Sequence, residues 1–142
     1  MKNNFSLRKW DSQILWLDPN EAQGYACAAL LQQRKIKADI NVFANVITFY
    51  DWYMVQNHKK GYTLFINMLE EGIDSDAFWS IFQKDEFLRK IPTLFLIQSV
   101  EQKTKIRSQI GKSIFGFLEA PLQQKTFLEM FLATRIFFEN AQ

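Results

Sequence analysis

Three prolines and five glycines are the strongest breaks in this chain of 142 residues, and they limit how long any helix or strand can run. Pro19, Pro92 and Pro121 each stand where a helix could begin or break, because proline fixes the φ angle and lacks a backbone N–H. The clearest start is DPNE at residues 18–21, where Asp18 can cap the first free amide groups of a helix. The spacing of these breaks predicts short elements joined by short loops.

Residues 40–57 show the sharpest amphipathic pattern when the chain is projected as a helix with about 100° per residue. The apolar half of that projection holds Ile40, Val42, Phe43, Val46, Ile47, Phe49, Tyr50, Tyr53 and Met54. The β-branched residues would tolerate a strand, but an alternating pattern fails whereas the helical one continues for about five turns. The segment is therefore predicted to be one helix.

The other predicted helices cover residues 21–34, 63–71, 75–90 and 121–139. The last of these is apolar on nearly all sides, which is typical of a helix at the centre of a bundle or under a second chain. Residues 93–100 are ambiguous, because the run TLFLI could be a buried strand as readily as a helix start. The expected fold class is all-α, a compact bundle of six or seven helices in one domain, residues 1–142. The alternative is an α+β fold with a short buried strand near 93–100.

The composition fits one globular domain, with 48% hydrophobic and 23% charged residues, and it excludes several kinds of site. A lone Cys27 and a lone His58 cannot build a zinc finger or an iron–sulfur cluster. Four carboxylates lie close together in the sequence but lack the spacing of a calcium-binding loop: Glu70, Glu71, Asp74 and Asp76. No metal site and no cofactor are therefore expected.

No catalytic constellation is visible either. His58 lies beside Lys59 and Lys60 at a predicted helix end, where positive charge meets the helix dipole, and no serine or cysteine motif accompanies it. Cys27 has no neighbouring cation of the kind that activates a thiolate, so we expect it to serve in packing. The chain is expected not to be an enzyme.

The charge and hydropathy of the chain bear on where it works. The first residues, MKNNFSLRKWD, never reach the apolar core of about 7 to 15 residues that a secretory signal requires. No window approaches the run of about 18 apolar residues needed to span a bilayer. The formal net charge of +2 is too small to indicate nucleic acid or a membrane surface by itself. The expectation is a cytoplasmic protein with no membrane partner.

Aromatic residues make up 15% of the chain, and Trp52 is the most informative of them. It falls on the polar half of the predicted helix 40–57, which carries a single charge. A weakly charged polar face with a tryptophan is typical of an interface, although a second layer of the same protein could equally cover Trp52. The predicted partner-binding residues are Trp52, Asn45, Asn41, Thr48 and Gln56.

These features favour a non-enzymatic protein-binding module that acts through aromatic helix surfaces. An adaptor, a chaperone, an inhibitor or an immunity-type protein would each fit this description. The partner would be another protein or a second copy of this chain, and the latter case would give a homo-oligomer.

Two alternatives remain open. A nucleic-acid-binding protein would use the basic stretch 103–112, with Lys103, Lys105, Arg107 and Lys112 on phosphates, although no aromatic residue lies there to stack on bases. A metal-dependent nuclease would use Glu101 and Lys103, with Asp85 upstream, because this spacing resembles the E-x-K half of a restriction-endonuclease-like site. That site requires a strand, since on a helix the two side chains diverge by about 200°.

Overall fold

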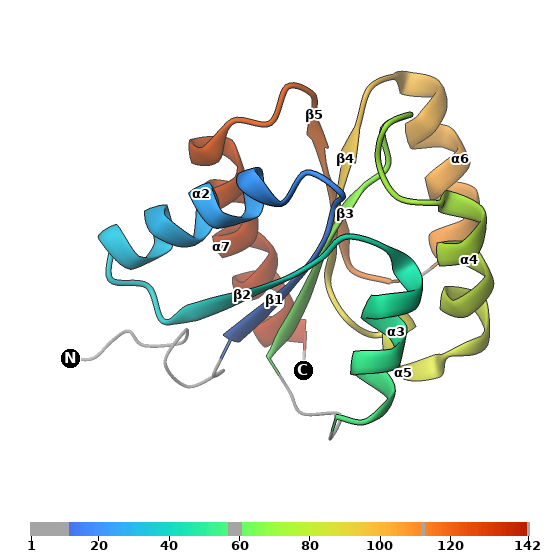
Figure 1. The fold of residues 1–142 in the computed structure, drawn as a ribbon, viewed down its shortest axis with the longest axis horizontal. Coiled ribbons are helices and arrows are strands. Elements are labelled where there is room, and N and C mark those ends of the chain that lie inside the picture. The colour runs from blue at the N-terminus through green and yellow to red at the C-terminus, as the bar shows by residue number, and fades with distance from the viewer. Residues whose placement is uncertain (1–11, 57–60, 112, 142) are drawn as a thin grey trace.

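The computed structural model describes residues 12–56, 61–111 and 113–141, which form a parallel five-stranded sheet with helices on both faces (Figure 1). The elements in chain order are β1 (Ser12–Leu17), α2 (Glu21–Gln33), β2 (Ala38–Phe43), α3 (Val46–Met54), β3 (Tyr62–Asn67), α4 (Ser75–Lys84), α5 (Glu86–Arg89), β4 (Thr93–Ile97), α6 (Val100–Ile110), β5 (Phe115–Glu119) and α7 (Gln124–Ala141). The strands lie in the order β2-β1-β3-β4-β5, and all four pairings are parallel. This is the order of one class of doubly wound α/β folds.

The central strands arise from continuous apolar runs. All six residues of β3 (YTLFIN) and all five of β4 (TLFLI) are buried. A parallel strand that is covered on both faces needs apolar side chains on both sides, so it shows no alternation along the chain.

The sheet divides the interior into two apolar layers. One layer lies under α3, α4, α5 and α6 and includes Phe49 and Phe95. The other lies under α2 and α7 and includes Trp16, Phe65 and Phe127. The rings of Trp16 and Phe65 stack there with their centroids 3.7 Å apart, which joins β1 to β3 through their side chains.

The prediction of an all-α bundle is wrong. The predicted helix 63–71 is β3 with the turn that follows it, and the predicted helix 40–57 is divided between β2 and α3. Asn45 makes that division, because its side chain accepts a hydrogen bond of 2.8 Å from the Thr48 amide and caps α3. The helical projection failed because the apolar residues of a strand and those of the helix directly after it can fall on the same side of a single helical projection.

The other predicted elements fare better. Helices form at α2 and α7, and the predicted helix 75–90 forms in two pieces, α4 and α5, on either side of Asp85. The segment near 93–100 contains a buried strand, β4, but as one of five parallel strands with helices between them. The fold class is therefore α/β, which corrects both the all-α prediction and its α+β alternative.

The apolar character of the last helix follows from its place in this fold. Phe127 and Phe131 of α7 are fully buried against the sheet, whereas Ile136 and Phe137 are exposed. Within the described parts of the chain, no helix combines the length and the hydropathy needed to cross a membrane.

Candidate functional site

Asp18 and Asn67 lie at the carboxyl ends of the neighbouring strands β1 and β3, in the middle of the sheet. The chain leaves β1 for α2 on one face of the sheet and leaves β3 for α4 on the other (Figure 1). In open parallel sheets, ligands bind at the carboxyl edge where the connections diverge in this way. We call Asp18 and Asn67 the switch-point pair.

The carboxylate of Asp18 is fully buried and surrounded by hydrogen-bond donors. Its Oδ1 accepts from the Asn67 side-chain Nδ2 and from the Asn20 amide, both at 2.9 Å. Its Oδ2 accepts from the Trp16 indole Nε1 at 3.4 Å. Both carboxylate oxygens are therefore occupied by groups of the protein itself.

The amide of Asn67 is equally committed. While its Nδ2 donates to Asp18, its Oδ1 accepts from the Leu69 amide at 2.9 Å and its backbone oxygen accepts from the Ile73 amide at 3.0 Å. Gly72 lies so close that a Cβ there would stand 2.2 Å from the Asn67 backbone oxygen. The loop after β3 is thus folded back over the switch-point pair.

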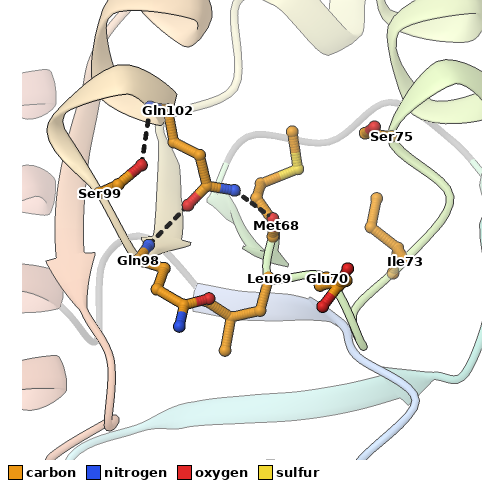
Figure 2. Close-up of a pocket in the computed structure, with 8 residues that line it drawn as sticks. All are labelled: Met68, Leu69, Glu70, Ile73, Ser75, Gln98, Ser99 and Gln102. Atoms are coloured by element: carbon orange, nitrogen blue, oxygen red, sulfur yellow. Dashed lines mark hydrogen bonds between the residues drawn. The ribbon is translucent and has the colours of Figure 1, made fainter.

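A cavity of about 420 Å³ opens beside this pair, between the loops that follow β3 and β4 (Figure 2). Gln102 crosses it: the side-chain Nε2 donates to the Met68 backbone oxygen, and Oε1 accepts from the Gln98 amide at 2.6 Å. Ser99 caps α6 by accepting from the Gln102 amide at 3.2 Å. The Gln102 side chain therefore ties the two loops together.

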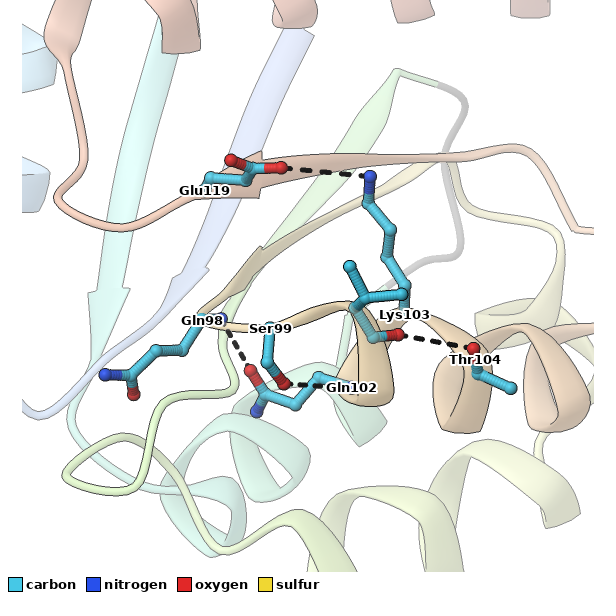
Figure 3. A network of polar contacts seen from close by, with 7 residues as sticks. Gln98, Ser99, Gln102, Lys103, Thr104 and Glu119 are labelled. Atoms are coloured by element: carbon cyan, nitrogen blue, oxygen red, sulfur yellow. Dashed lines mark hydrogen bonds and ion pairs between the residues drawn. The ribbon is translucent and has the colours of Figure 1, made fainter.

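The ionic groups lie nearer the sheet edge, on α6 and at the end of β5 (Figure 3). Lys103 Nζ lies 3.9 Å from Glu119 Oε2 at the end of β5 and 5.7 Å from the ring centroid of Phe117. Arg107, one turn further along α6, lies 5.5 Å from the same ring. These cations lie beside β5, where they contact Phe117 and Glu119.

The chemistry open to the switch-point pair is limited by burial and by residue type. Asp18 is the only buried carboxylate in the described part of the chain, and an amide such as Asn67 is not a nucleophile. Among residues 12–56, 61–111 and 113–141, no group of three or more histidine, cysteine or acidic side chains could hold a metal ion. The pair is built to hold two strands together.

Four of the five predicted partner-binding residues follow α3, with Asn45 at its cap and Thr48, Trp52 and Gln56 at steps of four residues, whereas Asn41 lies in β2. Trp52 is partly buried, and its ring packs near those of Phe43 and Tyr62, with centroids 5.3 and 6.3 Å away. The other four make hydrogen bonds within the chain: Asn45 caps α3 through Thr48, Asn41 in β2 donates to Gln13 of β1, and Gln56 donates to the Trp52 backbone oxygen. Trp52 is thus half-buried against the protein itself, and its part in binding a partner stays a prediction.

The basic stretch lies mainly on α6, which carries Lys103, Lys105 and Arg107, while Lys112 and also His58 lie outside the described residues. Glu101 is helical too, so the E-x-K geometry required for a nuclease is lost. Cys27 is a buried residue of α2, and burial raises the pKa of its thiol to about 12, as expected of a packing residue.

Sequence reasoning missed the switch-point pair because it depends on reading β3 as a strand. The sequence predicts Asp18 only as a cap for the helix at 21–34, but the cap residue of α2 is Asn20, and Asp18 accepts from the Asn20 amide just before the helix. The available signal was a polar residue directly after each of two apolar runs, ILWLD and TLFIN. Two such runs in parallel strands bring their final residues to one edge.

Neither a protein-family model nor a curated protein matches this sequence, but several solved structures share its fold. A response regulator receiver protein from Burkholderia phymatum has a TM-score of 0.66 at 10% identity, over 87% of this chain and 94% of that one. Chemotaxis protein CheY4 from Vibrio cholerae has a TM-score of 0.68 at 14% identity, over 87% and 98%. NtrX from Brucella abortus, in a complex with ATP, has a TM-score of 0.68 at 13% identity over 92% of this chain, which spans 28% of the NtrX chain.

These likenesses correct the functional prediction as well as the fold. The prediction of an adaptor acting through aromatic helix surfaces is wrong: the similar solved structures include a response regulator receiver protein and a signal receiver domain, and most of the aromatic side chains fill the layers beside the sheet. The nucleic-acid and nuclease alternatives find no support there either. The chain has the α/β fold of response-regulator receiver domains.

Proposed function

We propose that this chain is a receiver-like module of signal transduction that binds another protein in one fixed state, without phosphoryl transfer at its switch point. The observation that carries the proposal is the closed switch-point pair: a fully buried Asp18 bonded to Asn67 at 2.9 Å. The proposal also makes the chain a binding module and not an enzyme.

The signalling part of the proposal is supported by the fold. The similar structures include a receiver protein, a chemotaxis protein and the signal receiver domain of a signal transduction histidine kinase from Syntrophus aciditrophicus. Receiver domains of this kind are phosphoacceptor modules that act with other proteins. A protein partner is accordingly the partner we propose here.

The absence of phosphoryl transfer is supported by the chemistry of the pair. To accept a phosphoryl group, a carboxylate oxygen must attack phosphorus in line with the leaving group, and cations must neutralise the charge that develops. Asp18 has no exposed surface, and its two oxygens already accept three hydrogen bonds. Asn67, at the same edge, offers an amide that cannot form an acyl phosphate.

The fixed state is supported by the loops around the pair. A pair of adjacent carboxylates would repel one another unless a cation lay between them, whereas an amide that donates to a carboxylate is stable without one. Gln102 further ties the loop after β3 to the loop after β4. The carboxyl edge is thus held together by hydrogen bonds between one carboxylate, that of Asp18, and the neutral amides of Asn67 and Gln102.

The test is incubation with acetyl phosphate and Mg²⁺, followed by intact-mass spectrometry, with a phosphorylatable receiver domain in the same tube as the positive control. We expect the control to gain one phosphoryl group and this chain to gain none. Stoichiometric gain by this chain that disappears in Asp18→Asn would overturn the proposal. Gain that persists in Asp18→Asn would place an acceptor elsewhere and would equally contradict it.

A further inference from the structure

The outer edge of β5 is an unpaired strand edge. The strand order places β5 at one end of the sheet, so only β4 pairs with it among the described strands. Ile114 accepts from the Thr93 amide at 3.0 Å, and the Ala120 amide donates to Ile97 at 2.8 Å. Because alternate residues of a parallel strand bond to the same neighbour, the backbone groups of Phe115, Phe117 and Glu119 point away from β4.

Two cations line this edge on the α6 side of the sheet. Lys103 and Arg107 lie 5.7 and 5.5 Å from the ring centroid of Phe117, whose side chain packs against the α6 layer. Lys103 is also 3.9 Å from the exposed Glu119, as Figure 3 shows. We call Lys103 and Arg107 the cationic rail, because they are one helical turn apart and follow the strand.

A groove lined by apolar side chains and two hydroxyl residues lies on the α7 side of the same edge. Its volume is about 360 Å³, and it is lined by Ser113, Ile114, Phe115, Ala133, Thr134 and Phe137. Phe137 is 63% exposed, which is unusual for so large an apolar side chain. The two sides of the edge therefore differ in chemistry, one cationic and the other apolar.

We propose that an extended segment of a partner protein, alternating acidic and apolar residues, adds to β5 as a sixth strand. Side chains alternate across a strand, so one set would meet the cationic rail while the other entered the groove beside Ile114 and Phe137. Backbone hydrogen bonds to Phe115, Phe117 and Glu119 would fix the register. This inference rests on the proposed protein-binding function and names the surface and the chemistry of its partner.

Charge argues against the other occupants of this edge. Two copies joined edge to edge in an antiparallel continuous sheet would be related by an axis perpendicular to the sheet, which brings the two cationic rails onto the same side. Like charges would then face one another across the junction. The opposite edge, β2, carries a single charged residue, Asp39, which is acidic, so it does not attract the same segment.

The experiment uses a short synthetic peptide that alternates glutamate and valine, titrated into the full chain labelled with ¹⁵N. We expect saturable binding, and slower hydrogen exchange at the amides of Phe115, Phe117 and Glu119. The amides of Ile40 and Val42 in β2 provide the internal control and should not change. The same peptide with lysine in place of glutamate should not bind.

Charge reversal of the rail supplies the second arm. Lys103→Glu combined with Arg107→Glu should weaken peptide binding by about tenfold or more, and Arg107→Glu alone should weaken it less. Lys105→Glu, on the same helix but without the Phe117 contact, is the matched control and should bind nearly as the parent chain does.

Several results would overturn the inference. One is the absence of saturable binding of the peptide to the parent chain, and another is a loss of peptide affinity in Lys105→Glu as large as that in the double variant. Slower hydrogen exchange at the β2 amides in place of the β5 amides would also overturn it, as would heparin slowing exchange at the β5 amides as much as the peptide does. The last result would mean that polyanions in general bind there. None of these outcomes alters the phosphodonor experiment, which reads phosphorylation of the chain and not strand addition at β5, so the two proposals fail separately.

Discussion

The side-chain Nδ2 of Asn67 lies 2.9 Å from Oδ1 of Asp18, and this one bond joins the carboxyl ends of the two central strands. Both residues are buried, so the bond is made in a medium where an unmatched partner is costly. The behaviour of the molecule under mutation should follow from that pairing.

Asn67→Asp replaces the amide donor by a second carboxylate. We expect the free energy of unfolding at neutral pH to fall by about 2 kcal/mol or more, because Asp18 loses a donor and gains a like charge. The two carboxylates of the folded variant would then bind a proton more tightly than they do in the unfolded variant. The loss in free energy of unfolding should therefore shrink as the pH is lowered toward 4. Urea denaturation of variant and parent at both pH values measures it, and a penalty independent of pH would contradict the electrostatic cause.

Gly72→Ala tests the close approach of the loop to Asn67. A Cβ at this position would stand 2.2 Å from backbone oxygen, which cannot move as a side chain can, so we expect a loss of roughly 2 to 4 kcal/mol in stability. Gly111→Ala is the matched control: it has open space around it and a φ of +65°, so its cost should be near 1 kcal/mol. Equal losses in the two variants would show that the loop is not packed as described.

Trp52→Ala tests whether that side chain serves packing within the chain or contact with a partner. Because its ring packs against Phe43 and Tyr62, we expect the variant to lose about 2 to 3 kcal/mol of stability. Ile47→Ala, on the same helix and 72% exposed, should change stability by less than about 0.5 kcal/mol. Thermal and urea denaturation of the two variants provide the comparison, and an unchanged Trp52→Ala would restore the free-surface interpretation.

Cys27 should make stability depend on pH in the alkaline range. Burial raises the pKa of its thiol from the ordinary 9.0 to about 12 in the folded chain, so between these values the unfolded chain releases a proton that the folded chain keeps. Stability should therefore fall as the pH rises above about 9. Cys27→Ala should remove part of that slope, leaving the tyrosine contribution, since burial also raises the pKa of Tyr50 and Tyr62. Identical slopes in variant and parent would contradict the assignment.

Helix ends could be read from the sequence more readily than the strands. Helix starts near residues 21 and 75 are confirmed at α2 and α4, because prolines and caps act within a few residues, although the cap of α4 is Asp74 and Ser75 is the first helical residue. The runs YTLFIN and TLFLI gave no such local signal, since their strand character comes from being covered on both faces. Asn45 shows the limit of periodicity: one capping side chain separates a strand from a helix within a segment that projects as a single helix.

The candidate site was hidden for the same reason. Asp18 and Asn67 are 49 positions apart, and only the pairing of β1 with β3 brings them together. Lys103 and Arg107 were recognised as a basic cluster, but their target, Phe117, comes from the next strand and not from the basic stretch. A site made by parallel pairing cannot be assembled until the strands themselves are assigned.

The most direct test of the closed switch point is the pair of side-chain amide resonances of Asn67 in a ¹⁵N spectrum, followed as Mg²⁺ and acetyl phosphate are added. A closed pair predicts slow hydrogen exchange at this buried amide and no change of either resonance at any concentration of the two reagents. Saturable movement of these resonances, lost in Asp18→Asn, would show that the edge opens and binds, and would contradict a fixed, phosphoryl-independent module.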